Sequence, residues 1–178
     1  ERRILDEILD YLEQAGTGLL MYSGLRYQSD EQFETDLAML NRSAESCAER
    51  GVRLLYHNHN WEFEENGRVM GALLTRASPA LGLCPDLGWV HKGGEDVIGF
   101  LERARDRIGA VHVKDFATRD PGLDTVILGT GCVPLREAAA WLRAHTDDLW
   151  VIAEQDKYEG DPADAAKANG AFLAEVLG

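Results

Sequence analysis

Apolar residues in this 178-residue sequence switch repeatedly between the spacing of an amphipathic helix and the short runs typical of a buried strand. The first segment has helical spacing in Ile4, Ile8 and Leu12 and ends near Gly16. The alternation continues along the whole chain and predicts strands over 18–22, 52–56, 81–84, 110–114 and 149–153. Six helices are predicted around these five strands, which indicates an α/β protein with a parallel sheet.

The predicted helices carry recognisable start signals. Ser29 and Gln32 have the spacing of a capping box before an amphipathic segment that ends at Gly51. Asp161 and Pro162 open the last helix as its cap and first residue. The first helix is expected to run from about Ile4 to near Gly16, and the others near 67–77, 95–107 and 134–145.

The connections between the predicted elements differ in length according to direction. Helix-to-strand joints are tight and marked by glycine, whereas strand-to-helix joints are long, at 57–66, 86–94, 115–132 and 154–161. Parallel α/β proteins place their sites in the loops that follow the carboxyl ends of the strands. We therefore expect the functional residues at that end of the sheet.

Composition excludes several classes of partner. The net charge is −13 and only four lysines occur, so neither nucleic acid nor an anionic membrane is expected to bind. No apolar run is long enough to cross a bilayer. The three cysteines, Cys47, Cys84 and Cys132, form no CxxC pair, which favours a cytoplasmic protein without a disulfide framework. We expect one domain over residues 1–178.

Four successive predicted strands end in side chains that bind metals or move protons. Alternation along a strand places His57 with His59, His112 with Lys114, and Glu154 with Asp156 on common faces. Asp86 follows the strand between the first two of these pairs. If these faces point inward, the groups converge on one point, where mixed oxygen and nitrogen ligands suit one Mn²⁺, Mg²⁺, Co²⁺ or Zn²⁺ ion.

Four ordered segments resemble the xylose isomerase-like TIM-barrel superfamily, especially its sugar phosphate isomerase/epimerase and inosose dehydratase-like members. They are His57-Asn-His-Asn-Trp-Glu-Phe63, Asp86-Leu-Gly-Trp89, Val111-His-Val-Lys-Asp-Phe116 and Glu154-Gln-Asp156. The resemblance implies a (β/α)8 barrel, of which residues 1–178 form the C-terminal part with strands four to eight. A barrel needs about 250 residues, so we expect strand 18–22 to be an uncovered edge, in a homo-oligomer or a longer polypeptide.

The resemblance also implies a ligand set. Asp86, His112 and Glu154 match the family's ligands from strands six, seven and eight. The ligand from strand five stays open between His57, His59 and Glu62, because this chain has Tyr56-His57 where many members have a glutamate. Glu62 is favoured because it would keep a set of three carboxylates and one histidine.

The implied activity is an isomerase, epimerase or dehydratase that removes a proton beside the carbonyl of a small sugar or cyclitol. Candidate catalytic residues are Glu154, His57, His59 and Lys114, with Lys114 holding a substrate oxygen. Trp61, Trp89 and His91 are candidates for substrate contact, although core packing explains the tryptophans equally well. An endonuclease IV-like phosphodiesterase and a non-catalytic half-barrel completed by a partner are the alternatives.

Overall fold

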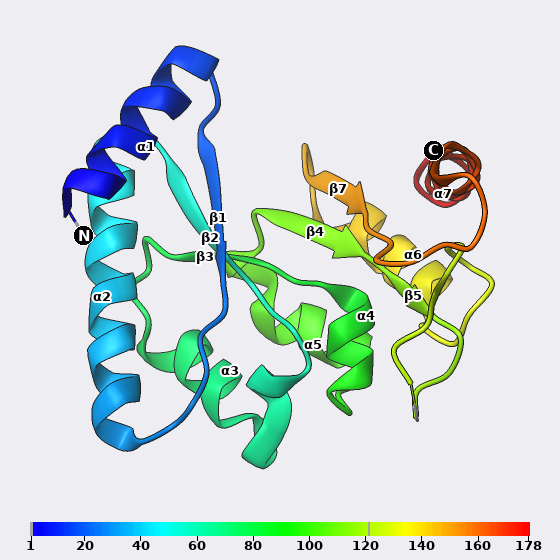
Figure 1. Cartoon of the computed structure of the whole chain (residues 1–178), viewed down its shortest axis with the longest axis horizontal. Coiled ribbons are helices and arrows are strands. Elements are labelled where there is room, and N and C mark those ends of the chain that lie inside the picture. Colours follow the sequence, from blue (N-terminus) through cyan, green and yellow to red (C-terminus); the bar gives the residue numbers. More distant parts are fainter. Residues whose placement is uncertain (1, 121) are drawn as a thin grey trace.

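Five parallel strands form a curved sheet in the computed structural model, which describes residues 2–120 and 122–178 (Figure 1). The strands are β1 (Leu19–Ser23), β2 (Arg53–His57), β3 (Gly82–Cys84), β4 (Ala110–Val113) and β7 (Trp150–Ala153). β1, β2 and β3 pair in that order, and β4 pairs with β7. Parallel bridges from Leu83 to Ile108 and from Asp86 to His112 join the two groups. The predicted α/β class with a parallel sheet is confirmed.

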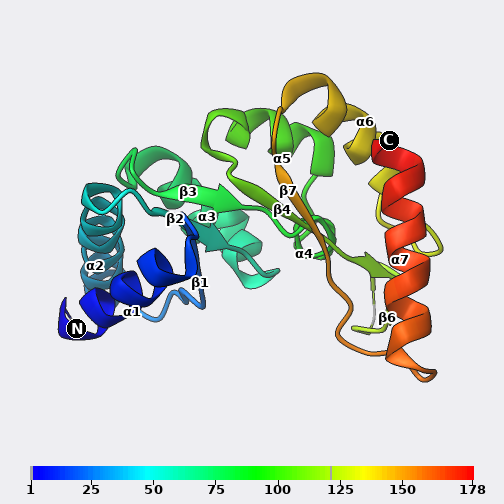
Figure 2. The same cartoon turned by 90° about the horizontal axis from the view of Figure 1, so that it is seen from above.

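Helices lie along the outer side of this arc (Figure 2). They are α1 (Arg2–Ala15), α2 (Asp30–Glu49), α3 (Glu64–Arg76), α5 (Val97–Ala104), α6 (Leu135–His145) and α7 (Pro162–Leu177). The Ser29 hydroxyl accepts a hydrogen bond from Gln32 N at 3.2 Å, and the Asp161 carboxylate accepts one from Ala163 N at 2.9 Å. Both predicted caps are therefore confirmed. None of the helices within the described ranges is long and apolar enough to cross a membrane.

The expectation that 86–94 and 115–132 are loops was wrong in part. The first contains the short helix α4 (Leu87–Lys92), and the second contains the antiparallel strands β5 (Asp115–Phe116) and β6 (Thr125–Val126). Elements this short contain too few residues for a periodic pattern to emerge. The helix expected over 95–107 also ends early, at Ala104, and continues as the 3₁₀ helix η2 (Arg105–Arg107).

The sheet separates two apolar clusters. The larger cluster fills the space between the strands and the helices. The smaller one consists of Leu55, Cys84 and Ala110 with the partly buried Leu19 against them, all from strands. Because strand side chains alternate between faces, the next inward positions after Leu55 and Ala110 are His57 and His112. The small cluster therefore lies on the same face of the sheet as these histidines, one inward position before them along each strand.

Arg107 precedes β4, and its side chain forms hydrogen bonds with the backbone that leads into β3. Its half-buried guanidinium donates hydrogen bonds to backbone carbonyls at the end of α3 and in the joint that follows. The acceptors are the carbonyl oxygens of Leu73, Leu74, Ala77, Ser78 and Leu81. One side chain thus satisfies carbonyls that the end of a helix would otherwise leave without partners.

The arc is open between β1 and β7 (Figure 2). Within the described part of the chain, β1 pairs only with β2, and β7 pairs only with β4. Apolar side chains are exposed at both edges, including Met21 and Tyr22 at 39% and 37% and Trp150 at 68%. The architecture is that of a partial barrel.

Candidate metal centre

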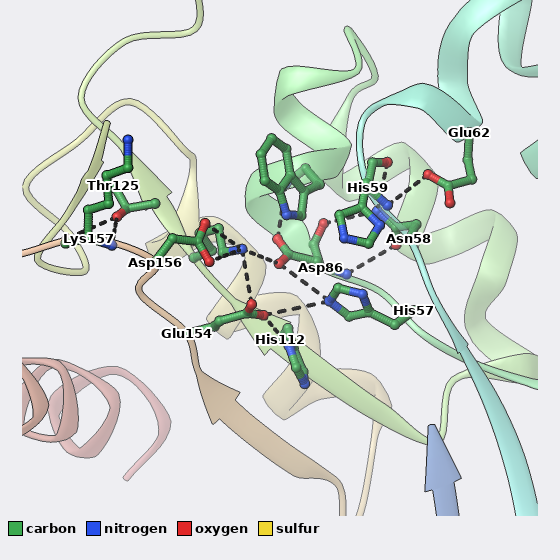
Figure 3. A network of polar contacts seen from close by, with 12 residues as sticks. His57, Asn58, His59, Glu62, Asp86, His112, Thr125, Glu154, Asp156 and Lys157 are labelled. Atoms are coloured by element: carbon green, nitrogen blue, oxygen red, sulfur yellow. Dashed lines mark hydrogen bonds and ion pairs between the residues drawn. The ribbon is translucent and has the colours of Figure 1, made fainter. Parts of the chain in front are cut away.

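Four side chains from consecutive strands of the sheet converge at its carboxyl end. His57 ends β2, Asp86 follows β3, His112 lies in β4 and Glu154 follows β7. One potential ligand atom from each lies within 4.8 Å of the others, and we call these four residues the His57 group (Figure 3). His57 Nε2 lies 3.6 Å from both Asp86 Oδ2 and Glu154 Oε2, while His112 Nδ1 contacts Glu154 Oε2 directly.

Two atoms of this group are buried without a hydrogen-bond partner in the described residues, namely His57 Nε2 and Asp86 Oδ2. Asp86 is 0% exposed, and its other oxygen, Oδ1, accepts a hydrogen bond from Trp89 N at 3.0 Å as the cap of α4. Buried polar atoms rarely stay unpaired unless an ion or water completes them. Two imidazoles and two carboxylates around one point therefore fit a divalent cation with mixed nitrogen and oxygen ligands.

Lys114 lies beside the His57 group and is 1% exposed. Its Nζ is 3.2 Å from Glu154 Oε1 and 3.1 Å from Asp156 Oδ2, and 3.4 Å from Asp86 Oδ2 without forming a hydrogen bond there. Burial lowers the pKa of Lys114, but the surrounding carboxylates outweigh it and the net shift is upward. The ammonium group therefore stays charged and balances the carboxylates.

The neighbouring carboxylates also set the charge of the two histidines at the end of β2. Burial lowers the pKa of His57, but its interactions with Asp86 and Glu154 prevail and raise that pKa to about 9. Burial and the nearby His57 lower the pKa of His59 to about 4. The neighbouring imidazoles of His112 and His57 hold the pKa of Glu154 well below its usual range. At neutral pH, His57 and His59 thus differ in charge, with His59 neutral.

The raised pKa of His57 predicts that cation binding depends on pH. A protonated imidazole cannot bind a metal ion, so the cation must displace the proton that His57 retains up to about pH 9. We expect the affinity for Mn²⁺ to rise between about pH 6 and pH 8, and binding near neutral pH to release protons. Calorimetric titrations in two buffers with different ionisation heats measure this release. An affinity that is constant over this range would contradict the prediction.

Glu62, the ligand favoured from the sequence, lies outside the His57 group. It is 0% exposed on the 3₁₀ helix η1 (Trp61–Phe63), and its oxygens accept hydrogen bonds from the Tyr56 hydroxyl and from His59 N, both at 2.7 Å. Of the three residues that the sequence left open as the ligand from this strand, His57 is the one that belongs to the group. The geometry therefore favours two histidines and two carboxylates over three carboxylates and one histidine.

The other residues expected at the site are not members of the His57 group. The His59 ring stacks on Trp61 with centroids 4.0 Å apart, and its centroid lies 5.1 Å from that of His57. Trp89 is buried on α4, 8% exposed, with the Lys114 ammonium 4.8 Å from its ring. His91 also lies on α4, where Arg119 and Asp115 are among its charged neighbours.

Sequence reasoning missed Asn58, whose side chain forms hydrogen bonds with the backbone of Asp86. Its side chain is 1% exposed, accepts a hydrogen bond from Asp86 N at 3.1 Å and donates to Asp86 O at 3.4 Å. These bonds join the exits of β2 and β3. An asparagine between two histidines was the available signal, because its side chain must leave the face that the histidines share.

Comparison with known proteins shows the family to which this chain belongs. The family model described as xylose isomerase-like TIM barrel matches residues 1–176. The chain belongs to the xylose isomerase-like TIM barrel family. The chain is similar to the inosose dehydratase of Geobacillus kaustophilus, to which it is 32% identical over 167 residues, covering 84% of this chain and 54% of the relative. The chain thus spans about half the length of this curated relative.

Solved structures share the xylose isomerase-like fold at lower identity. A sugar phosphate isomerase/epimerase from Parabacteroides distasonis superimposes with a TM-score of 0.78 at 18% identity, covering 96% of this chain and 62% of that one. A structure of the IOLI protein with a bound zinc atom superimposes with a TM-score of 0.77 at 16% identity, covering 98% of this chain and 68% of that one. These likenesses confirm the fold that the resemblance implied.

Proposed function

We propose that residues 1–178 form the C-terminal, metal-binding part of a barrel enzyme that depends on one divalent cation. The enzyme acts as an isomerase, epimerase or dehydratase on a sugar or cyclitol and removes a proton next to a carbonyl. The observation that carries the proposal is the His57 group, with two buried atoms that lack hydrogen-bond partners in the described part of the chain. The similarity to a protein named inosose dehydratase supports the substrate class.

The cation would be held by His57, Asp86, His112 and Glu154 and would supply a Lewis acid that stabilises negative charge on the substrate oxygen. Lys114 donates a hydrogen bond to a substrate oxygen, because its charged ammonium is fixed beside Glu154 and Asp156. His59 Nδ1 is without a partner among the described residues, and its ring centroid lies 5.1 Å from that of His57, so this nitrogen is free to accept a proton from the substrate. Glu154, 31% exposed in its side chain, is the second group able to take or return one.

The stacked ring of Trp61 and the buried ring of Trp89 lie near the His59 ring, at centroid distances of 4.0 and 5.8 Å. Aromatic faces beside hydrogen-bonding groups suit the alternating apolar and hydroxyl surfaces of a sugar ring. We therefore assign substrate contact to Trp61 and Trp89 rather than to His91. The absence of a basic cluster in the sequence favours an uncharged substrate.

Solvent deuterium tests the reaction. The metal-loaded protein is incubated in D₂O with an inosose, a ketose or a 3-keto sugar, and we expect deuterium at the carbon next to the carbonyl in product or recovered substrate. Proton removal exposes that carbon to exchange with solvent. The control is the same protein after chelation, which should incorporate none. Turnover without label would indicate a hydride shift, and stoichiometric metal without turnover would favour the non-catalytic half-barrel.

A further inference from the structure

Glu62 joins two loops that leave neighbouring strands. Its Oε1 accepts a hydrogen bond from the Tyr56 hydroxyl at 2.7 Å, and that hydroxyl in turn accepts one from Leu25 N at 3.0 Å, in the loop after β1. Its Oε2 accepts a hydrogen bond from His59 N at 2.7 Å, in the loop after β2 (Figure 3). Glu62 and Tyr56 are 0% and 1% exposed, so water does not compete for these bonds.

A second connection fixes the ring of His59. Trp61 Nε1 donates a hydrogen bond to Leu25 O at 3.1 Å, and the indole ring stacks on the His59 imidazole with an interplanar angle of 10°. The backbone of His59 and its ring are therefore held by two neighbouring residues, Glu62 and Trp61. Both connections lead back to Leu25.

We propose that Glu62 and Tyr56 are positioning residues that fix His59 beside the His57 group, and that Glu62 is not a metal ligand. The inference rests on the proposed function, in which His59 accepts a proton from the substrate. Each Glu62 oxygen accepts a hydrogen bond from a protein donor, and neither oxygen belongs to the four ligand atoms that lie close together. A base displaced by about 1 Å loses a large share of its effect on the rate.

The variants Glu62→Gln and Tyr56→Phe test the proposal in the Co²⁺-loaded protein. Glutamine replaces one acceptor oxygen by a donor, so it cannot accept from both the Tyr56 hydroxyl and His59 N. Phenylalanine leaves the Glu62 oxygen and Leu25 N without the hydroxyl that joins them. Glu64→Gln is the matched control, because it makes the same chemical change at an exposed neighbouring glutamate.

We expect both variants to keep the visible absorption spectrum of bound Co²⁺ and its affinity within about threefold, because no ligand changes. The backbone amide of His59 should exchange with D₂O at least about tenfold faster. The turnover number for substrate deuteration should fall at least about tenfold with little change in KM. Glu64→Gln should match the wild type in all three measurements.

A changed Co²⁺ spectrum or lost ion in Glu62→Gln would make Glu62 a ligand and overturn the proposal. Wild-type turnover in both variants would overturn it as well. If the wild-type protein itself deuterates no substrate, the proposed function fails. The Co²⁺ spectrum and the His59 amide exchange then still decide whether Glu62 binds the cation or holds the loop. Circular dichroism identifies a variant that does not fold, and the other variant then supplies the result.

Discussion

Replacing Asp86 with alanine is expected to weaken binding of a divalent cation at least about a hundredfold. Removing a residue that only hydrogen-bonds to a metal ligand weakens binding by up to about a hundredfold, and removing a ligand itself should cost at least as much. Asp86 Oδ2 is buried, lacks a hydrogen-bond partner in the described residues and lies 3.6 Å from His57 Nε2. Without this carboxylate, the cation loses a ligand and part of the negative charge that opposes Lys114. Titration with Co²⁺, followed by absorption, measures the loss.

Asp86→Asn separates the proposed metal contact of Asp86 from its contact with Trp89 N at the start of α4. Asparagine can still cap α4 by accepting from Trp89 N, so the helix should start normally. The bonds to Asn58 involve the backbone of residue 86 and should also persist. We expect Asp86→Asn to fold like the wild type and still bind the cation weakly. Wild-type affinity in both variants would exclude Asp86 as a ligand.

Replacing Arg107 with methionine is expected to lower the free energy of unfolding by about 3 kcal/mol, since several backbone carbonyls lose a charged donor. Methionine keeps an apolar stem of similar length, so the main change is the loss of hydrogen bonds to carbonyls such as Leu73 O and Ser78 O, at 2.7 and 2.5 Å. The melting temperature should fall by roughly 10 °C. Urea unfolding followed by circular dichroism gives the free energy.

Arg105→Met is the matched control for Arg107. Arg105 is exposed, and its ion pair with Glu102 is long at 4.0 Å. Removing an exposed pair of this kind should change the free energy of unfolding by less than about 0.5 kcal/mol. Equal effects at positions 105 and 107 would show that the carbonyl bonds of Arg107 contribute little.

The sequence predicted the strands well because each is a short apolar run, and three of the runs follow a tight joint that contains Gly16, Gly51 or Gly109. The run 81–84 became β3 with the bounds Gly82–Cys84, and 110–114 became β4 with the bounds Ala110–Val113. Parallel strands bring their ends together, which is why Asp86, His112 and Glu154 could be expected to meet. The geometry does bring them together, and their function as ligands stays a prediction.

The position of the Glu62 carboxylate could not be predicted from the sequence. Residues beyond the end of a strand no longer follow its alternation, so the turn of η1 decides where this carboxylate points. His57 still lies within β2, two residues after the inward-facing Leu55, and alternation alone placed it correctly. The preference for Glu62 came from a ligand pattern in relatives, which contains no information about the loop in this chain.

The open arc contains the whole His57 group within one stretch of polypeptide. All four members of the His57 group lie between residues 57 and 154, on strands that are neighbours in the sheet. β1, at one side of the opening, contributes none of them. Substitutions along that edge can therefore alter the surface beside the His57 group without replacing any of its four members. In such an arrangement, the surroundings of the group can diverge during evolution while the four residues stay the same.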